Sequence, residues 1–433
     1  MNTDKLLTMA LEHSKAEQTE VSMNLDRSAL TRFANSTIHQ NMLFENGVIR
    51  VRAVFGKKVA EGTSNRIDEQ GVRSLVDSVV EMARLQDENK DFVSLPKQTA
   101  PFRCETGHYD STAASTAEQR AAAVRSLVAE ADRIGGTAAG SFSVESYERV
   151  VRNTLGIDAS FNGTSANLLT VVTGPDGGFG YASAISGNVD DIDAKAVGAE
   201  AADGARESRN PTGIEPGEYE CVLMPYAVAD MIGMLCWMGF GAMEYQEGQS
   251  WVCGKLGQKI ASDNVNLWDD GCEPKTIVAA FDGEGVAKQK VDLIKDGVAA
   301  GVLYDSYTAH RKGEKSTGHA PWGRAGNLVM APGDASIEDM ISSTKRGILV
   351  TRFHYTNISH RMSASFTGMT RDGTFLIENG RITRPVKNLR VTQSITEAMS
   401  DTQMIGRERK LGDGALVPAL KLGKFRFSSA TEF

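Results

Sequence analysis

Hydrophobic and polar residues follow two different periods in the first half of the chain. Residues 4–14 carry leucine and alanine at helical spacing, whereas residues 47–55 alternate, with apolar side chains on one face and arginines on the other. Further helices are predicted at about 75–83, 116–134 and 190–208, with short strands between them. Because the strands come in runs joined by turns, the pattern favours an α+β fold with an antiparallel sheet over a Rossmann fold.

Local signals indicate where some of these elements begin and turn. Ser115 stands three residues before Glu118, which is the pattern of a capping box at a helix start. The tetrapeptide PDGG at 175–178 predicts a tight turn between two strands. Asn379-Gly380 lies between two alternating segments and predicts a two-residue hairpin turn.

The segment at 208–220 separates two halves of different character. It contains two prolines and two glycines and no hydrophobic period, which is typical of a linker. We therefore predict an N-terminal α+β domain of helices and antiparallel sheet at 1–209, and a C-terminal domain at 216–433. From "TIVAAF" at 276–281 onward most segments read as short strands, so the second domain is expected to be β-rich, as a curved sheet or partial barrel.

The C-terminal domain is expected to open with a strongly apolar helix that starts near Tyr226. Met231, Met234, Leu235 and Met238 recur on one side of it at helical spacing. Methionine fills irregular gaps and adaptable surfaces, and a helix that is apolar nearly all round is buried. We expect this helix in the core or against a partner.

Composition narrows the class of protein. The formal net charge is −8 and the pI is near 5.5, which argues against a dedicated nucleic-acid binder. Five cysteines, odd in number and without a CxxC motif, make a disulfide framework or zinc ribbon unexpected and fit a reducing compartment. The first residues show no signal-peptide pattern, and the longest apolar run, 231–243, is shorter than the ~20 residues that span a bilayer. A cytoplasmic protein is expected.

The stretch "YTAHRKGEKSTGHAP" at 307–321 concentrates residue types that bind metals and phosphates. A P-loop needs a glycine before its Gly-Lys-Ser/Thr, but Gly313 is followed by Glu314, and the earlier glycine is missing. His310 and His319 are nine residues apart, which is no recognised zinc spacing. The stretch therefore predicts neither kind of site.

Other catalytic patterns are also incomplete. No GxSxG, HExxH or strand-linked GxGxxG motif occurs in the sequence. His354 and His360 are six residues apart on an extended segment, and their even spacing could place them on one face of a strand. A hydrolase that uses this pair with a carboxylate stays open as a minor alternative.

Several long segments resemble the TldD/PmbA family, peptidase-like proteins once described as modulators of DNA gyrase. The clearest is "FDGEGVAKQKVDLIKDGVAAGVLYDSYTAHRKGEKSTGHA" at 281–320. Others are "NLVMAPGDASIEDMISSTKRGILVTRF" at 327–353, "GTFLIENGRITRPVKNLRV" at 373–391, "LTRFANSTIHQ" at 30–40 and "RNTLGIDASFNGTSANLL" at 152–169. The resemblance covers nearly the whole chain in one order.

The resemblance also bears on metal binding. TldD-type members carry HExxxH on the first helix of the C-terminal domain and a cysteine near the C-terminus, whereas PmbA/TldE-type members lack these zinc ligands. With "GQSWVCGKLG" at 248–257 as the anchor, the ligand positions fall near Gly233 and Met238, and Cys272 is the last cysteine. Neither residue can bind zinc as an imidazole does, so the chain resembles the PmbA/TldE type, with no metal expected in it.

The resemblance implies a subunit of a metallopeptidase that processes unfolded peptides. This chain is expected to be non-catalytic, to shape a substrate channel, and to pair with a TldD-type subunit that holds the zinc. His310, Ser316, Thr317, Gly318 and His319 are the candidate channel or partner contacts, although family members often carry asparagine at the position of His319. The alternative is a homodimeric peptide-binding or regulatory protein without peptidase activity. Neither alternative includes direct contact with nucleic acid or membrane.

Overall fold

A long antiparallel sheet forms the N-terminal lobe of the computed structural model, which describes residues 3–97, 102–104 and 106–431. Its six strands run in the order β3-β2-β1-β4-β5-β6. The elements of this lobe are α1 (Thr3–His13), β1 (Gln18–Ala34), β2 (Thr37–Phe55), β3 (Lys58–Ser64), α2 (Glu69–Leu85), α3 (Asp110–Ala113), α4 (Ala117–Arg133), β4 (Thr137–Asn153), β5 (Asp158–Thr173), β6 (Phe179–Ser186), the 3-10 turn η1 (Val189–Asp191) and α5 (Ala194–Glu207).

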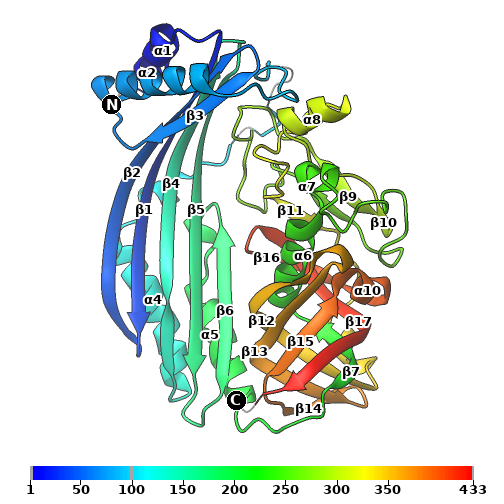
Figure 1. Cartoon of the computed structure of the whole chain (residues 1–433). Helices are drawn as coiled ribbons and strands as arrows, with labels where there is room; N and C mark the ends of the chain where they lie inside the picture. Colours follow the sequence, from blue (N-terminus) through cyan, green and yellow to red (C-terminus); the bar gives the residue numbers. More distant parts are fainter. Residues whose placement is uncertain (1–2, 98–101, 105, 432–433) are drawn as a thin grey trace.

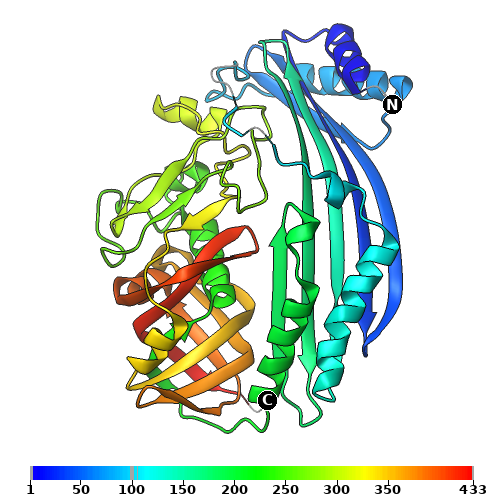
Figure 2. The same cartoon turned by 180° about the vertical axis from the view of Figure 1, so that it is seen from behind.

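Two separate pairs of helices cover one face of this sheet. The side chains of Val21 and Met23 on β1 pack with α1 and α2, whereas Ala29 and Phe33 farther along the same strand pack with α4 and α5. These positions share one face because side chains alternate along a strand. Figures 1 and 2 show the two helical layers at opposite ends of the long strands. Between the two pairs, the short helix α3 lies over the sheet, and Arg27 donates to the Ala113 carbonyl of α3 at 3.2 Å.

The capping box of α4 lies one residue after the predicted position. The Thr116 hydroxyl accepts from the Gln119 backbone N–H, and the Gln119 side chain accepts from the Thr116 N–H. Two overlapping patterns, Ser115–Glu118 and Thr116–Gln119, compete in the sequence. The Ser115 carbonyl instead accepts from the Arg120 guanidinium, so the choice of Ser115 was wrong by one position.

The C-terminal lobe is a curved, mixed sheet wrapped around one long helix. Its elements are β7 (Gly217–Leu223), α6 (Pro225–Gly239), α7 (Ala242–Gln246), β8 (Leu267–Asp269), β9 (Val291–Lys295), β10 (Val298–Ala299), α8 (Ser306–Lys312), β11 (Leu328–Met330), α9 (Ile337–Ser342), β12 (Arg346–His360), the 3-10 turn η2 (Arg361–Ser363), β13 (Ser365–Glu378), β14 (Arg381–Pro385), β15 (Leu389–Ser394), α10 (Ile395–Ser400), β16 (Thr402–Gly412) and β17 (Ala415–Ala430).

The sheet of this lobe curls back on itself, because the strands that run from β17 through β15, β13 and β12 to β7 are joined again by the pair β7–β17. β7 pairs in parallel with β12 on one side and antiparallel with β17 on the other. The Asn379-Gly380 turn joins β13 to β14 as predicted, with positive φ at both residues. The predicted strand at 276–281 is wrong, because only Phe281 makes an isolated bridge there. The α+β fold class, with a β-rich second lobe, is confirmed; whether 1–209 and 216–433 fold independently stays a prediction.

Helix α6 is buried, as its apolar sequence predicts. Met231, Leu235 and Met238 are completely enclosed, and Met234 is nearly so. They belong to the largest hydrophobic cluster of the lobe, together with side chains from β12, β13 and β17. Trp237 is the exception on this helix, with 54% of its surface exposed. None of the helices among the described residues combines the length and apolar character needed to cross a bilayer.

The cysteine expectation is wrong in one respect. Cys104 and Cys272 form a disulfide across 168 residues of sequence, while Cys221, Cys236 and Cys253 are free. The pairing arises because residues 102–104 lie against the C-terminal lobe, where Phe102 packs with Phe281 and Arg103 donates to the Asp270 carboxylate at 2.6 Å. Spacing along the chain contains no sign of this proximity.

Candidate functional site

A cleft of about 290 Å³ runs beside α6 at the position where the resemblance places the zinc ligands. Gly233 lies on its floor, and a Cβ added there would meet no atom within 4 Å. Met238, the second ligand-equivalent residue, points into the hydrophobic core and is fully enclosed. Gly233 therefore faces the cleft but has no side chain, and the side chain of Met238 points away from the cleft. The remaining lining residues are Cys236, Trp237, Gly241, Glu244, Gly323, Arg324, Ala325, Gly326, Leu328, Asp413 and Gly414.

The lip of the cleft carries aromatic and cationic side chains. Trp237, which lines the cleft, is 54% exposed, and Trp322, which immediately precedes the lining residue Gly323, is 49% exposed. The Arg324 guanidinium lies 5.1 Å from the centre of the Trp322 ring, and the Arg361 guanidinium donates to the Trp237 carbonyl at 3.4 Å. Exposed tryptophan beside arginine is typical of contact surfaces, because it offers a large apolar area at low entropy cost.

Acidic groups adjoin the same helix. Asp230 lies one turn before Gly233, and burial, together with the charge of Asp413, raises its pKa to about 7. The opposite charge of Arg352 and the Phe353 backbone N–H only partly offset this. Asp230 therefore exchanges its proton near neutral pH, as expected of a carboxyl held in a partly desolvated site.

Arg352 joins this region to the N-terminal lobe. Its guanidinium pairs with the Asp372 carboxylate, with Nε at 2.7 Å. It also lies 4.3 Å from the centre of the Tyr181 ring on β6. Tyr181 in turn packs edge-on against Tyr226 of α6, with ring centres 5.0 Å apart. The two lobes are thus held in contact beside the cleft.

The stretch at 307–321 does not act as one site. His310 lies at the exposed end of α8, whereas the chain turns back through Ser316 and Thr317 toward the core. Thr317 Oγ1 accepts from the Tyr304 N–H at 2.8 Å, and the Ser316 hydroxyl donates to the Tyr304 carbonyl at 3.3 Å. Gly318 has φ +74°, and a Cβ there would lie 2.4 Å from the Ala287 carbonyl oxygen. The small residues of this turn allow close packing.

His319 is the centre of a buried polar network. Its Nε2 lies 2.9 Å from Asp269 Oδ1, and its Nδ1 lies 2.9 Å from Thr317 Oγ1. Burial lowers the pKa of His319 despite the contact with Asp269, so the ring is neutral and Nε2 carries the proton donated to the carboxylate. Burial also opposes ionisation of Asp269, but the hydrogen bond from His319 and the charge of Lys288 outweigh it and hold its pKa well below its usual range.

Thr317, His319 and Asp269 have the residue types of a hydrolytic triad, but not its access. The side chains of His319 and Asp269 have no exposed surface. The Thr317 oxygen is already held by the backbone of Tyr304. A catalytic nucleophile must be accessible to the substrate carbonyl and must lie within hydrogen-bond distance of its base. The chain of contacts from Thr317 through His319 to Asp269 is therefore structural. Asp269 also accepts from the N–H of Gly326 in the cleft wall at 2.8 Å, so these contacts fix the turn at 316–319 relative to that wall.

His354 and His360 do not converge either. Both belong to β12, but the strand shifts register twice between them. His360 Nδ1 bonds the Ser363 hydroxyl at 3.0 Å, and His354 packs against Tyr355. Within residues 3–97, 102–104 and 106–431, no group of three or more His, Cys, Asp or Glu side chains is arranged to hold a metal ion.

The sequence reasoning missed the residues at the cleft lip. Trp237 was included in an apolar helix, but its side chain is exposed, and Arg361 from the turn between β12 and β13 contacts its carbonyl. Trp322 takes φ +63°, with its N–H donated to the Asp305 carboxylate at 2.7 Å. The one usable signal was the Asp413-Gly414 dipeptide, which is typical of a hairpin turn and does join β16 to β17.

Comparisons with known proteins agree on one family. Residues 110–209 match the PmbA/TldA metallopeptidase central domain, and residues 216–429 match the PmbA/TldA metallopeptidase C-terminal domain. The "Metalloprotease PmbA" of Escherichia coli O157:H7 is 23% identical over 414 residues, which cover 93% of this chain and 90% of that protein. The "Metalloprotease TldD homolog" of Haemophilus influenzae is 32% identical over 170 residues, 37% of this chain and 35% of that protein.

Solved structures share the fold. TldE from Thermococcus kodakarensis superposes with a TM-score of 0.89 at 20% identity, covering 98% of this chain and 99% of that one. A Thermotoga maritima protein described as a modulator of a DNA gyrase gives a TM-score of 0.86 at 18% identity, covering 98% and 99%. The matched domains, the relatives and the shared fold lead to one conclusion: the chain belongs to the PmbA/TldD family.

Proposed function

We propose that this chain is the non-catalytic, PmbA/TldE-type subunit of a metallopeptidase that cleaves unfolded peptides. The observation that carries the proposal is Gly233, a residue without a side chain on the floor of the cleft. Zinc takes nitrogen, thiolate or carboxylate ligands. Glycine supplies none, and the thioether of Met238 is buried in the core. In this proposal a cytoplasmic TldD-type partner contributes the zinc and the catalytic groups.

The role left to this chain is to shape the path of the peptide. The cleft beside α6 combines the open position at Gly233 with the exposed Trp237 in its lining, and the exposed Trp322 immediately precedes the lining residue Gly323. An unfolded peptide offers apolar side chains and a regular backbone. Tryptophan can contact the apolar side chains without sequence preference, and strand edges can bind the peptide backbone. The loop at Ser316–Gly318 supports this wall from behind, with His310 left as the exposed candidate for partner contact.

Activity measurements on matched variants test the proposal. We expect casein cleavage when this chain is combined with a TldD-type subunit, and none from this chain alone with zinc. Gly233→Leu should fill the cleft and reduce cleavage by the pair at least tenfold. Gly213→Leu is the matched control, because a Cβ at Gly213 in the linker also meets no atom within 4 Å. Zinc-dependent cleavage by this chain alone would overturn the proposal.

The alternative function, a homodimeric peptide-binding or regulatory protein, predicts a different result. In that case labelled unfolded peptide binds to the chain alone, Gly233→Leu abolishes the binding, and no TldD-type subunit gains activity from it. The aromatic lip at Trp237 is compatible with either function, so the activity of the pair discriminates between them.

A further inference from the structure

Half of strand β2 forms an unprotected edge of the N-terminal sheet. β3 pairs only with Ile49–Phe55, so among the described residues no strand covers the outer side of Thr37–Val48. Figures 1 and 2 show this edge on the far side of the sheet from the C-terminal lobe. Unpaired N–H and C=O groups along such an edge are a template for pairing with another strand.

The usual protections of a free edge are nearly absent here. The segment reads TIHQNMLFENGV, with no lysine, arginine or proline and with Glu45 as its one carboxylate. Leu43 and Phe44 are 55% and 48% exposed. The pairing of β2 with β1 shifts register once, at His39, between the pairs Arg32–Gln40 and Phe33–Ile38. Residues 40–48 beyond this shift are paired regularly. A regular, apolar edge of this kind is expected to be covered.

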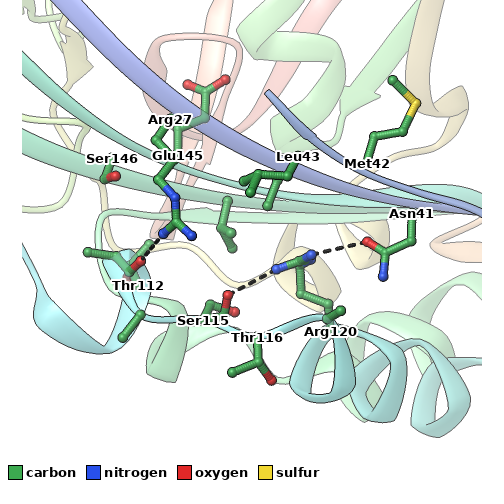
Figure 3. Close-up of a pocket in the computed structure, with 15 residues that line it drawn as sticks. Arg27, Asn41, Met42, Leu43, Thr112, Ser115, Thr116, Arg120, Glu145 and Ser146 are labelled. Atoms are coloured by element: carbon green, nitrogen blue, oxygen red, sulfur yellow. Dashed lines mark hydrogen bonds between the residues drawn. The ribbon is translucent and has the colours of Figure 1, made fainter. Parts of the chain in front are cut away.

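A cavity lies directly beside the regular part of the edge. It measures about 460 Å³, and Asn41, Met42 and Leu43 form one wall, with the start of α4 opposite (Figure 3). Arg120 on α4 is 3% exposed and donates to Asn41 Oδ1 at 3.1 Å. The cavity offers room for an apolar side chain that arrives with a strand added to the edge.

We propose that residues 40–46 of β2 pair antiparallel with the same residues of a second copy of this chain, with Leu43 opposite Leu43. This register is symmetric, as a two-fold interface requires. It brings each Leu43 beside the cavity of the other copy. The proposal concerns a surface remote from the cleft at α6 and does not rest on the proposed peptidase role.

The polar residues of the segment agree with this register. It places Asn41 of one copy opposite Glu45 of the other, so that no two carboxylates face each other. Asn41 Oδ1 is already occupied by Arg120 and by the Thr31 hydroxyl at 3.3 Å, which leaves the Asn41 amide N–H groups to donate. Glu45 pairs with Arg27 at 3.3 Å and keeps capacity to accept a second hydrogen bond. Cross-strand pairs of this kind stabilise a defined register.

Two pairs of variants test the pairing on the full chain alone. Leu43→Cys places two thiols opposite each other, so mild oxidation should give a covalent dimer at least tenfold faster than Leu85→Cys, a control residue on α2 that is 85% exposed. Wild type is oxidised in parallel to account for the native thiols. Leu43→Lys should raise the dimer dissociation constant at least tenfold in analytical ultracentrifugation, whereas Leu85→Lys should not.

Any of three results would overturn the proposal. The first is a wild-type chain that is monomeric at about 50 μM, a concentration at which an edge contact of micromolar affinity is populated. The others are equal crosslinking of the Leu43→Cys and Leu85→Cys variants, and a dimer dissociation constant that Leu43→Lys leaves unchanged. Because no partner subunit and no activity are involved, these outcomes are independent of the tests of the peptidase proposal.

Discussion

His319 donates from Nε2 to the Asp269 carboxylate across 2.9 Å, and neither side chain has any surface open to solvent. Asp269 also accepts from the backbone N–H groups of Gly326 and Asn327 at 2.8 and 2.9 Å. One carboxylate thus fixes the turn at 316–319 and the segment that lines the cleft. The residue that was hardest to explain from sequence, His319, holds two walls of the site together.

Asp269→Ala should destabilise the protein strongly. The substitution leaves His319 and two backbone N–H groups buried without their acceptor and removes the ion pair of Lys288, and breaking a buried pair in this way costs about 3–5 kcal/mol. Urea denaturation measures the change in the free energy of unfolding. Asp263→Ala is the control, because the Asp263 side chain is 92% exposed and its pair with Lys259 should contribute less than about 1 kcal/mol. Equal effects of the two substitutions would contradict the structural role given to Asp269.

Arg52 connects the two lobes, and its removal should be costly as well. Its Nη2 lies 2.8 Å from Glu20 on β1 and 3.0 Å from Glu284 of the C-terminal lobe, and both carboxylates are almost fully buried. Arg52→Met leaves these carboxylates unpaired, so the free energy of unfolding should fall by about 3–5 kcal/mol. Arg50→Met, one pleat away, removes an exposed pair with Glu61 and should cost less than about 1 kcal/mol. Thermal and urea unfolding of both variants provide the comparison.

The elements that could be predicted from sequence are those that local chemistry determines. Asn379-Gly380 forms its hairpin because both residues tolerate positive φ. The contacts that could not be predicted depend on tertiary distance. Cys104 meets Cys272 from 168 residues away, and His319 meets Asp269 from 50 residues away. The cleft itself arises from the packing of the sheet around α6, to which no local pattern points.

Asp230 should make the stability depend on pH near neutrality. Its pKa in the folded protein is raised to about 7, against about 3.9 in an unfolded chain. The folded state therefore binds the proton more tightly, and the stabilisation is complete below pH 4 and is lost as the pH rises through 7. Asp230→Asn should remove this loss. The free energy of unfolding of the variant minus that of wild type should therefore be roughly 1–3 kcal/mol larger at pH 8.5 than at pH 5. Parallel stability curves for the two proteins would show that Asp230 does not titrate in this range.

Two glycines of α6 should respond in opposite ways to the same substitution. Gly233 has open space at its Cβ position and lies in the middle of the helix, so Gly233→Ala should raise the free energy of unfolding by about 0.5–1 kcal/mol through reduced backbone entropy. Gly239 lies against Trp251, and an added Cβ would stand 1.9 Å from its Nε1 atom. Trp251 is enclosed and donates to the Leu235 carbonyl at 2.9 Å, so it cannot move aside without losing that bond. Gly239→Ala should therefore destabilise the protein by about 1–3 kcal/mol. Urea denaturation of the two variants separates helix propensity from packing, and a destabilised Gly233→Ala would mean that the floor of the cleft is closed.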